Sequence, residues 1–321
     1  MSFELHRRKH LEDELTKIAR RELRRTGKAL RTTADAASED VIHESRKSVK
    51  KVRALTTLMS EAGAKLPRKD RKRLKAAARA LSRLRDSAVV VESLDRVRRR
   101  YPKQFPDQTY RLVRHDLVAA RHRQEMQATH DGVVAQAAKQ LTKTRRSAKT
   151  WRSPSIKTSD MVALIASSYR RSRKAMRRSR ATEYPATLHQ WRKEVKTLWY
   201  QLRLAKPLTP GLAPLIADLK RLETYLGDGH NFVVLAATLR GCEDMRALRA
   251  ELRNIERLAA RMRVPLQRRA FTLGRRVYGR RPSTFARWVR NSSMKSSRHS
   301  VTRSPSRALG DCNEPPLQRT I

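Results

Sequence analysis

Apolar residues recur at helical spacing through most of the chain, and no segment alternates apolar and polar residues as a strand would. Prolines and glycines separate the periodic segments. The first half is predicted to contain helices at about residues 3–25, 40–62, 67–100, 107–130 and 133–148. The second half is predicted to contain helices at about residues 159–180, 184–206, 212–240, 243–263 and 265–289. The pattern therefore indicates an all-α protein.

One helical pattern occurs twice. Ile42–Met59 aligns without a gap with Leu188–Ala205, at an offset of about 146 residues. A second pair, Ala80–Leu94 and Tyr225–Leu239, aligns at an offset of about 145 residues. This internal repeat predicts two tandem helical bundles related by a pseudo-twofold axis, with equivalent faces meeting in one central basic groove or pore. The expected boundaries are a first bundle at 1–148, a basic linker at 149–158, a second bundle at 159–290 and a disordered basic tail rich in Ser, Arg and Pro at 291–321.

The repeated helices have one apolar side and one cationic side. In the first copy the apolar positions are Ile42, Val49, Val52, Leu55 and Met59, and the opposite side carries His43, Arg46, Lys47, Lys50, Lys51 and Arg53. In the second copy Leu188, Trp191, Val195, Leu198 and Leu202 oppose His189, Arg192, Lys193 and Lys196. Like charges three or four residues apart on a helix repel by a few tenths of a kcal/mol, about 0.2–0.5 per pair. A single face of this kind is often just solvated, but its repetition in the same His-x-x-Arg-Lys-x-x-Lys order favours an anion-binding site.

The net charge narrows the class of partner. Lys and Arg number 75 against 30 Asp and Glu, which gives a formal charge of +45. A charge of this size indicates a polyanionic partner, either nucleic acid, an anionic membrane surface or an inorganic phosphate chain. Aromatic residues make up only 5% of the chain, which disfavours single-strand binding by base stacking.

The sequence also indicates where the protein works. Cys242 and Cys312 are the only cysteines, too few for a disulfide framework or a thiolate metal site. The N-terminus has no apolar leader, and the longest apolar runs, such as Met161–Ala166, are far shorter than a membrane span. We therefore expect a protein of the cytoplasm that does not enter the membrane; the oligomeric state is not indicated.

Motifs for catalysis are missing. The sequence has no P-loop, no His-Glu-x-x-His helix, no Gly-x-Ser-x-Gly elbow and no clustered carboxylates for a metal pair. We expect no enzyme activity, cofactor or metal. His43 and His189 are interpreted as hydrogen-bonding or packing residues that gain protons when an anion binds, because a nearby anion raises the pKa of an imidazole. Trp191 and Trp199 are expected in the core or at the bundle rim.

These features together resemble the CHAD family, the histidine-containing α-helical domain. The resemblance rests on the doubled basic helix and on the Leu-Gly/Ser-x-x-x-Asp/Asn-x-x-Val helix that follows each copy, and it covers about residues 3–280. It implies two four-helix bundles about a pseudo-twofold axis, with a central pore that binds inorganic polyphosphate, often at polyphosphate granules. The ligand residues so implied are His43, Arg46, Lys47, Lys50, Arg53, Arg83 and Arg85, with His189, Arg192, Lys193, Lys196 and Arg203. We add Lys51 and His230 from the basic face and the repeat.

The second half departs from the first at several of these positions. Thr197 stands where the first half has Lys51, Trp199 where it has Arg53, and His230-Asn231 where it has Arg85-Asp86. The second wall is therefore expected to bind more weakly. Arg85 is interpreted equally well as an ion-pair partner of Asp86 or as a direct ligand contact. A protein that binds nucleic acid nonspecifically through the same charges is the main alternative, and a phosphate-ester or polyphosphate hydrolase is a third.

Overall fold

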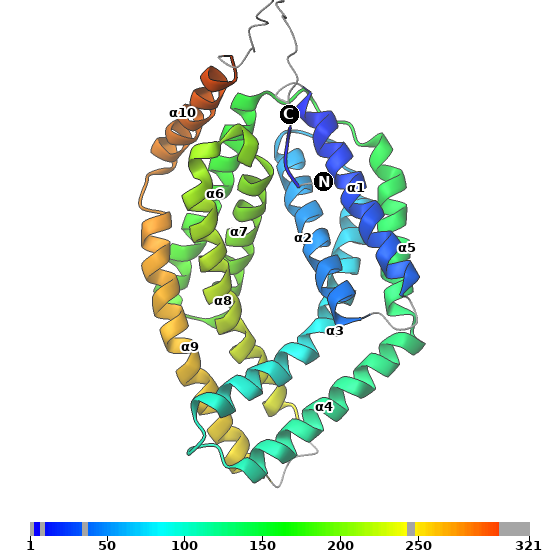
Figure 1. The fold of residues 1–321 in the computed structure, drawn as a ribbon, viewed down its shortest axis with the longest axis vertical. Coiled ribbons are helices and arrows are strands. Elements are labelled where there is room, and N and C mark those ends of the chain that lie inside the picture. The colour runs from blue at the N-terminus through cyan, green and yellow to red at the C-terminus, as the bar shows by residue number, and fades with distance from the viewer. Residues whose placement is uncertain (1–2, 7–9, 34–37, 243–247, 302–321) are drawn as a thin grey trace, which may run out of the picture.

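The computed structural model describes residues 3–6, 10–33, 38–242 and 248–301, and within these ranges the regular structure is helical (Figure 1). The all-α prediction is confirmed. The first half contains α1 (Leu11–Thr32), α2 (Glu39–Glu61), α3 (Arg68–Arg100), α4 (Asp107–His130) and α5 (Val133–Ser147). The second half contains α6 (Thr158–Thr182), α7 (Pro185–Leu204), α8 (Ala213–Arg240), α9 (Arg249–Val277) and α10 (Pro282–Val301). Short 3₁₀ turns lie at Ala148–Thr150, Lys206–Leu208 and Pro210–Leu212.

Helices that hold the same place in the two halves pack against each other. The basic helices α2 and α7 are in contact, and so are the helices that follow them, α3 and α8. Within each half, the first helix packs on the second and the second on the third. Figure 1 shows α2 and α7 standing side by side along the long axis, while α3, α4, α8 and α9 converge at the other end of the molecule. This arrangement brings the two repeated segments together.

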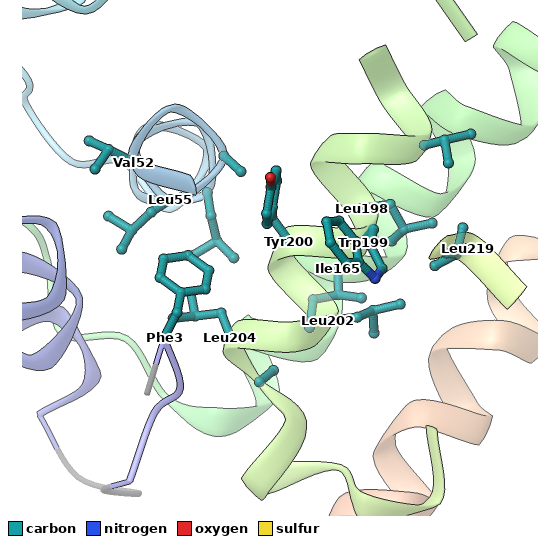
Figure 2. Close-up of a cluster of buried hydrophobic side chains, with 14 of the residues drawn as sticks. Phe3, Val52, Leu55, Ile165, Leu198, Trp199, Tyr200, Leu202, Leu204 and Leu219 are labelled. Carbon is teal, nitrogen blue, oxygen red and sulfur yellow. The ribbon is translucent and has the colours of Figure 1, made fainter. Parts of the chain in front are cut away.

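A hydrophobic core joins the two basic helices. Val52 and Leu55 of α2 are buried against α7, where Tyr200 and Leu204 are 2% and 0% exposed, and Phe3 fills the space beside them (Figure 2). Burying side chains of this size stabilises a fold by about 1.5–3 kcal/mol each. The apolar sides predicted for both helices are therefore in the core, except that Leu188 is only partly buried against it. Trp191 and Trp199 are in the core as well.

A second hydrophobic cluster closes the other end. Leu94 and Phe105 from the first half pack with Phe232 and Ile255 from the second, all at 1% exposure or less. The guanidinium of Arg96 crosses the ring of Phe232 at 5.0 Å and reaches Asp228 at 3.4 Å. Both clusters thus contain residues from both halves of the chain, and neither half encloses its own core completely.

Several helix boundaries differ from the sequence prediction. The first helix begins at Leu11 rather than residue 3. Phe3 and Leu5 precede it in a non-helical segment, where the Leu5 N–H donates to the carbonyl of Leu204 at 2.8 Å. Pro265 lies inside the continuous helix α9 instead of ending a helix, on a stretch whose neighbour Val264 is exposed, so water can satisfy the freed carbonyl. Helix α10 continues to Val301, past the predicted start of disorder at residue 291; residues 302–321 lie outside the described ranges.

The connection between the halves is firmly packed. Trp151 is 7% exposed and its indole N–H donates to Asp70 Oδ2 at 2.9 Å. Lys65 N–H donates to the carbonyl of Arg152 at 2.8 Å, and Ile156 N–H donates to Glu12 Oε2 at 3.0 Å. The segment 149–158 is therefore fixed against α1 and α3.

Candidate functional site

The cationic faces of α2 and α7 meet in a cluster around a single buried carboxylate. Lys50 of α2 lies within the electrostatic reach of Lys196 and Arg192 of α7, and of Glu223 of α8. Lys50 and Lys196 are equivalent in the internal repeat, and the charge of Lys196 acts on Lys50. Residues 146 positions apart in the chain thus act on each other electrostatically across the α2–α7 contact. We call Arg46, Lys50, Arg192, Lys196 and Glu223 the central cluster.

Glu223 holds the α7 side of the central cluster together. Its side chain is only 4% exposed. Oε1 accepts hydrogen bonds from Lys196 Nζ at 2.7 Å and Arg192 Nη2 at 3.1 Å, and Oε2 accepts one from Lys220 Nζ at 3.0 Å. Burial alone would raise the pKa of Glu223, but the charges of Lys196 and Arg192 outweigh it and lower the pKa to about 2. Glu223 is therefore ionised at neutral pH.

Lys50 has no such partner. No carboxylate of the described residues is hydrogen-bonded to its amine. Burial and the neighbouring charges of Lys196 and Arg46 lower the pKa of Lys50 to about 6, and the more distant Glu223 offsets this only in part. Burial also lowers the pKa of Lys196, in spite of its bond to Glu223. The central cluster holds more positive than negative charge, and an added anion would relieve that excess.

The two repeated arginines lie against equivalent points of the next helix. Arg46 Nη1 donates to the carbonyl of Ser82 at 3.0 Å. The guanidinium of Arg192 lies against Gly227, the residue equivalent to Ser82, where an added Cβ would stand 2.9 Å from Nη2. The small residue in the Leu-Gly/Ser pattern therefore makes room for the arginine. Arg192 Nε is buried and without a hydrogen-bond partner, so one guanidinium donor of the site is unsatisfied.

The histidines lie at the edges of the central cluster. The rings of His189 and His230 are 4.2 Å apart, and His189 Nδ1 is buried without a partner. Burial lowers the pKa of each to about 4, assisted by Lys193 and Arg192. On α2, His43 is exposed, and partial burial together with Lys47 lowers its pKa. The prediction that His43 and His189 gain protons on binding remains a prediction.

The other expected ligand residues lie around the central cluster or away from it. Lys51 contacts the buried Glu22 at 3.5 Å and lies over the ring of Phe3 at 5.3 Å, while Arg203 stacks on Trp199 at 5.0 Å. The charge of Arg203 acts on Lys51, so these two residues form a second cationic pair between α2 and α7. Three further cations, on α2 and α7, reach solvent in whole or in part: Lys47, Arg53 and Lys193.

Arg83 and Arg85 point elsewhere. Arg83 lines a cavity of about 450 Å³ between α3, α4 and α5, and Gln124 of α4 donates to its carbonyl. Arg85 is bound by the carboxylates of Glu39 and Glu92. The side chain of Asp86, its expected partner, lies outside the described residues. Ser82 gives its carbonyl to Arg46 of α2, whereas Arg83 turns toward α4 and α5 and Arg85 reaches Glu39 at the start of α2.

Glu223, Lys220 and Gly227 complete the site, and the sequence analysis did not single them out. An acid three residues after a lysine on a helix is a common surface pattern, so Glu223 carries no local signal. Only the packing of α8 on α7 shows that this carboxylate is buried among cations from another helix. Gly227 is the small residue of the Leu-Gly/Ser pattern, but the sequence alone does not show that this position makes room for Arg192.

Among the described residues, no group of three or more His, Cys, Asp or Glu side chains could hold a metal ion.

No helix in the described part of the chain is long and apolar enough to cross a membrane.

Comparison with known families shows which family the chain belongs to. The family model of the CHAD domain matches residues 17–240, which include both basic helices and Glu223. The chain belongs to the CHAD family. The crystal structure of the CHAD domain from the plant Ricinus communis has a similar fold, with a TM-score of 0.65 and 15% sequence identity, covering 88% of this chain and 96% of that one. No curated protein matches the chain. The CHAD match spans the α2–α7 contact on which the central cluster is built.

Proposed function

We propose that this CHAD protein binds inorganic polyphosphate, without catalysis, along the cationic faces of α2 and α7. The observation that carries the proposal is the central cluster, where the charge of Lys196 acts on Lys50 and one buried carboxylate is shared by several cations. Lys and Arg bind phosphate oxygens well, Arg through paired hydrogen bonds and Lys as a point charge. A chain of phosphates would supply the negative charge that the site lacks.

The chemistry of the site favours a ligand without bases. The aromatic residues beside the basic helices, Trp199 and Tyr200, are 9% and 2% exposed and belong to the core, so they offer no platform for stacking. Trp199 instead supports cations, with Lys220 Nζ 5.2 Å and Arg203 5.0 Å from its ring centre. These cations would contact the repeated negative charges of a phosphate chain, which carries no bases to recognise.

A charge-matched pair of variants tests the site. The first replaces Lys47, Lys50 and Arg53 on α2 by Ala, none of which is bonded to a buried acid. The control replaces Lys139, Lys143 and Arg146, three exposed cations on α5, which packs on α1 and α3. Both variants lose three lysine or arginine side chains. Titration of long-chain polyphosphate is expected to show at least about a tenfold loss of affinity and a shallower salt dependence for the first variant alone. An equal loss in the control would mean that binding is diffuse charge attraction.

A competition experiment separates the proposal from nucleic-acid binding. Labelled single-stranded DNA and double-stranded RNA are bound to the wild-type protein, and long-chain polyphosphate is added at matched phosphate concentration. Polyphosphate is expected to displace both, because its charges are closely spaced and flexible. Failure to displace them would favour the nucleic-acid function. Release of phosphate from polyphosphate in the presence of Mg²⁺ would instead reveal a hydrolase.

A further inference from the structure

The two halves of the central cluster are not equivalent in charge. Arg192 and Lys196 of the second half share the carboxylate of Glu223. An offset of about 145 residues places Ala78 at the corresponding position of the first half, on the helix that packs against α2. No acid therefore stands there for Lys50. At this pair of equivalent positions the acid, Glu223, is therefore present in the second half alone.

The Lys and Arg donors around Glu223 are of the kind that also bind phosphate oxygens. Its two oxygens accept from two ammonium groups and one guanidinium at 2.7, 3.0 and 3.1 Å. Charge-assisted bonds of this length from Arg and Lys are also how proteins hold phosphate oxygens. A phosphate that approached the same donors would meet a fixed negative charge a few ångströms away, in a site that is 4% exposed at Glu223 and therefore poorly screened.

We propose that Glu223 is an internal stand-in for a phosphate, occupying one subsite of the α7 wall and setting which anions bind. The inference rests on the proposed function. A small anion with few charges has to compete with Glu223 for Arg192 and Lys196 and gains little. A long polyanion first binds the α2 side, where no stand-in is present, and its many further phosphates then compete for the α7 donors at high local concentration. Glu223 thus makes the site selective for long chains.

Two reciprocal variants test this role. Glu223→Gln removes the stand-in, and Ala78→Glu builds a second one in the first half, where the side chain is only partly buried. The matched control is Asp218→Asn, which removes an acid of α8 that is bound to Arg221 and Arg276 outside the central cluster. Affinities for tripolyphosphate and for long-chain polyphosphate are measured for all four proteins, with circular dichroism to establish that each is folded.

Glu223→Gln is expected to bind tripolyphosphate about tenfold more tightly than wild type, with a smaller gain for the long chain, so that length selectivity falls. Ala78→Glu is expected to bind tripolyphosphate more weakly by a similar factor, and Asp218→Asn to remain at the wild-type value. The inference is overturned if Glu223→Gln leaves tripolyphosphate affinity unchanged or weaker. Should Glu223→Gln fail to fold, an unchanged or higher affinity in Ala78→Glu overturns it on its own.

Failure of the proposed function looks different. In that case neither tripolyphosphate nor the long chain binds the wild-type protein at any concentration used, and the Lys47/Lys50/Arg53 variant behaves as wild type does. If wild type binds both phosphates with the predicted site dependence and the Glu223 and Ala78 variants do not shift the ratio of the two affinities, polyphosphate binding stands and the stand-in role is rejected.

Discussion

The guanidinium of Arg192 lies directly against the backbone of Gly227, with Nη2 2.9 Å from the place where a Cβ would stand. This contact lets the arginine lie flat on α8 and reach Glu223 at 3.1 Å. The equivalent arginine of the first half, Arg46, reaches the carbonyl of Ser82 at 3.0 Å. The small residue at Gly227 is therefore a requirement of the cationic site rather than of the core.

Gly227→Ala is expected to separate binding from stability. The new methyl group displaces the end of a flexible side chain, which costs little, and Ala is better than Gly inside a helix by about 0.5–1 kcal/mol. Stability in urea is therefore expected to be unchanged or slightly higher, while polyphosphate affinity falls because Arg192 leaves its position. Gly229→Ala is the control, since its Cβ would meet Arg263 at an ordinary 3.7 Å. Lower stability with unchanged binding would contradict this reading.

Lys50 is expected to make the free energy of unfolding rise with pH in the neutral to alkaline range. The pKa of Lys50 is about 6 in the folded protein, against an ordinary value of 10.5 that the unfolded chain is expected to keep. Between these values the unfolded state binds more protons, so the free energy of unfolding rises with pH, by up to about 1.4 kcal/mol per unit from this group. Urea denaturation from about pH 7 to pH 9.5 should show this rise and a smaller one in Lys50→Met. Lys47→Met, at a half-buried position of the same helix, should keep the wild-type slope.

Anion binding is expected to bring protons to the histidine pair. The pKa values of His189 and His230 are about 4, so both are neutral at about pH 5.5, and a bound phosphate would raise both. The cations Lys193 and Arg192 oppose this, and Arg263 of α9 lines the small cavity beside the pair. Calorimetry in two buffers of different ionisation enthalpy should therefore register proton uptake, and affinity should rise as the pH falls.

The double variant His189→Gln/His230→Gln should lose that uptake, whereas His122→Gln, an exposed histidine of α4, should retain it. Equal uptake in the double variant and wild type would place the protonated groups elsewhere, with Lys50 the first to examine.

Trp151→Phe is expected to destabilise the protein by about 1–3 kcal/mol, since it removes a hydrogen bond from a buried carboxylate. Asp70 is 1% exposed and would keep its ion pair with Arg73, at 2.9 Å. Chemical denaturation measures the loss. Limited proteolysis should then cut within residues 149–158 faster than in wild type. If stability and cleavage are both unaffected, the segment is a passive linker.

The sequence predicted those features that depend on local pattern. The apolar and cationic sides of Ile42–Met59 follow from helical spacing, and the alignment with Leu188–Ala205 is enough to predict that the two helices share a role. It could not place Arg83 and Arg85, because their neighbours come from distant segments. Arg83 lies toward α4 and α5, and Arg85 is bound by Glu39 at the start of α2 and by Glu92. It could not find Glu223 either, because the partners of that acid come from another helix.

Some boundaries were missed for physical reasons of the same kind. Gly27 suggested a helix end, but α1 runs through it and packs closely on α5, where a Cβ would meet Thr142 Oγ1 at 3.3 Å. Pro265 suggested a break, but solvent lies beside it. In both cases tertiary surroundings, which a single sequence does not display, overrode a local preference.

The interlocked clusters at the two ends of the molecule have a consequence for how the chain folds. Leu94 and Phe105 have their partners, Phe232 and Ile255, more than a hundred positions later in the chain. An isolated N-terminal half would expose this apolar wall to water. Despite its repetitive sequence, the polypeptide should therefore melt in one all-or-none step, and neither copy should acquire native structure before the other has been synthesised.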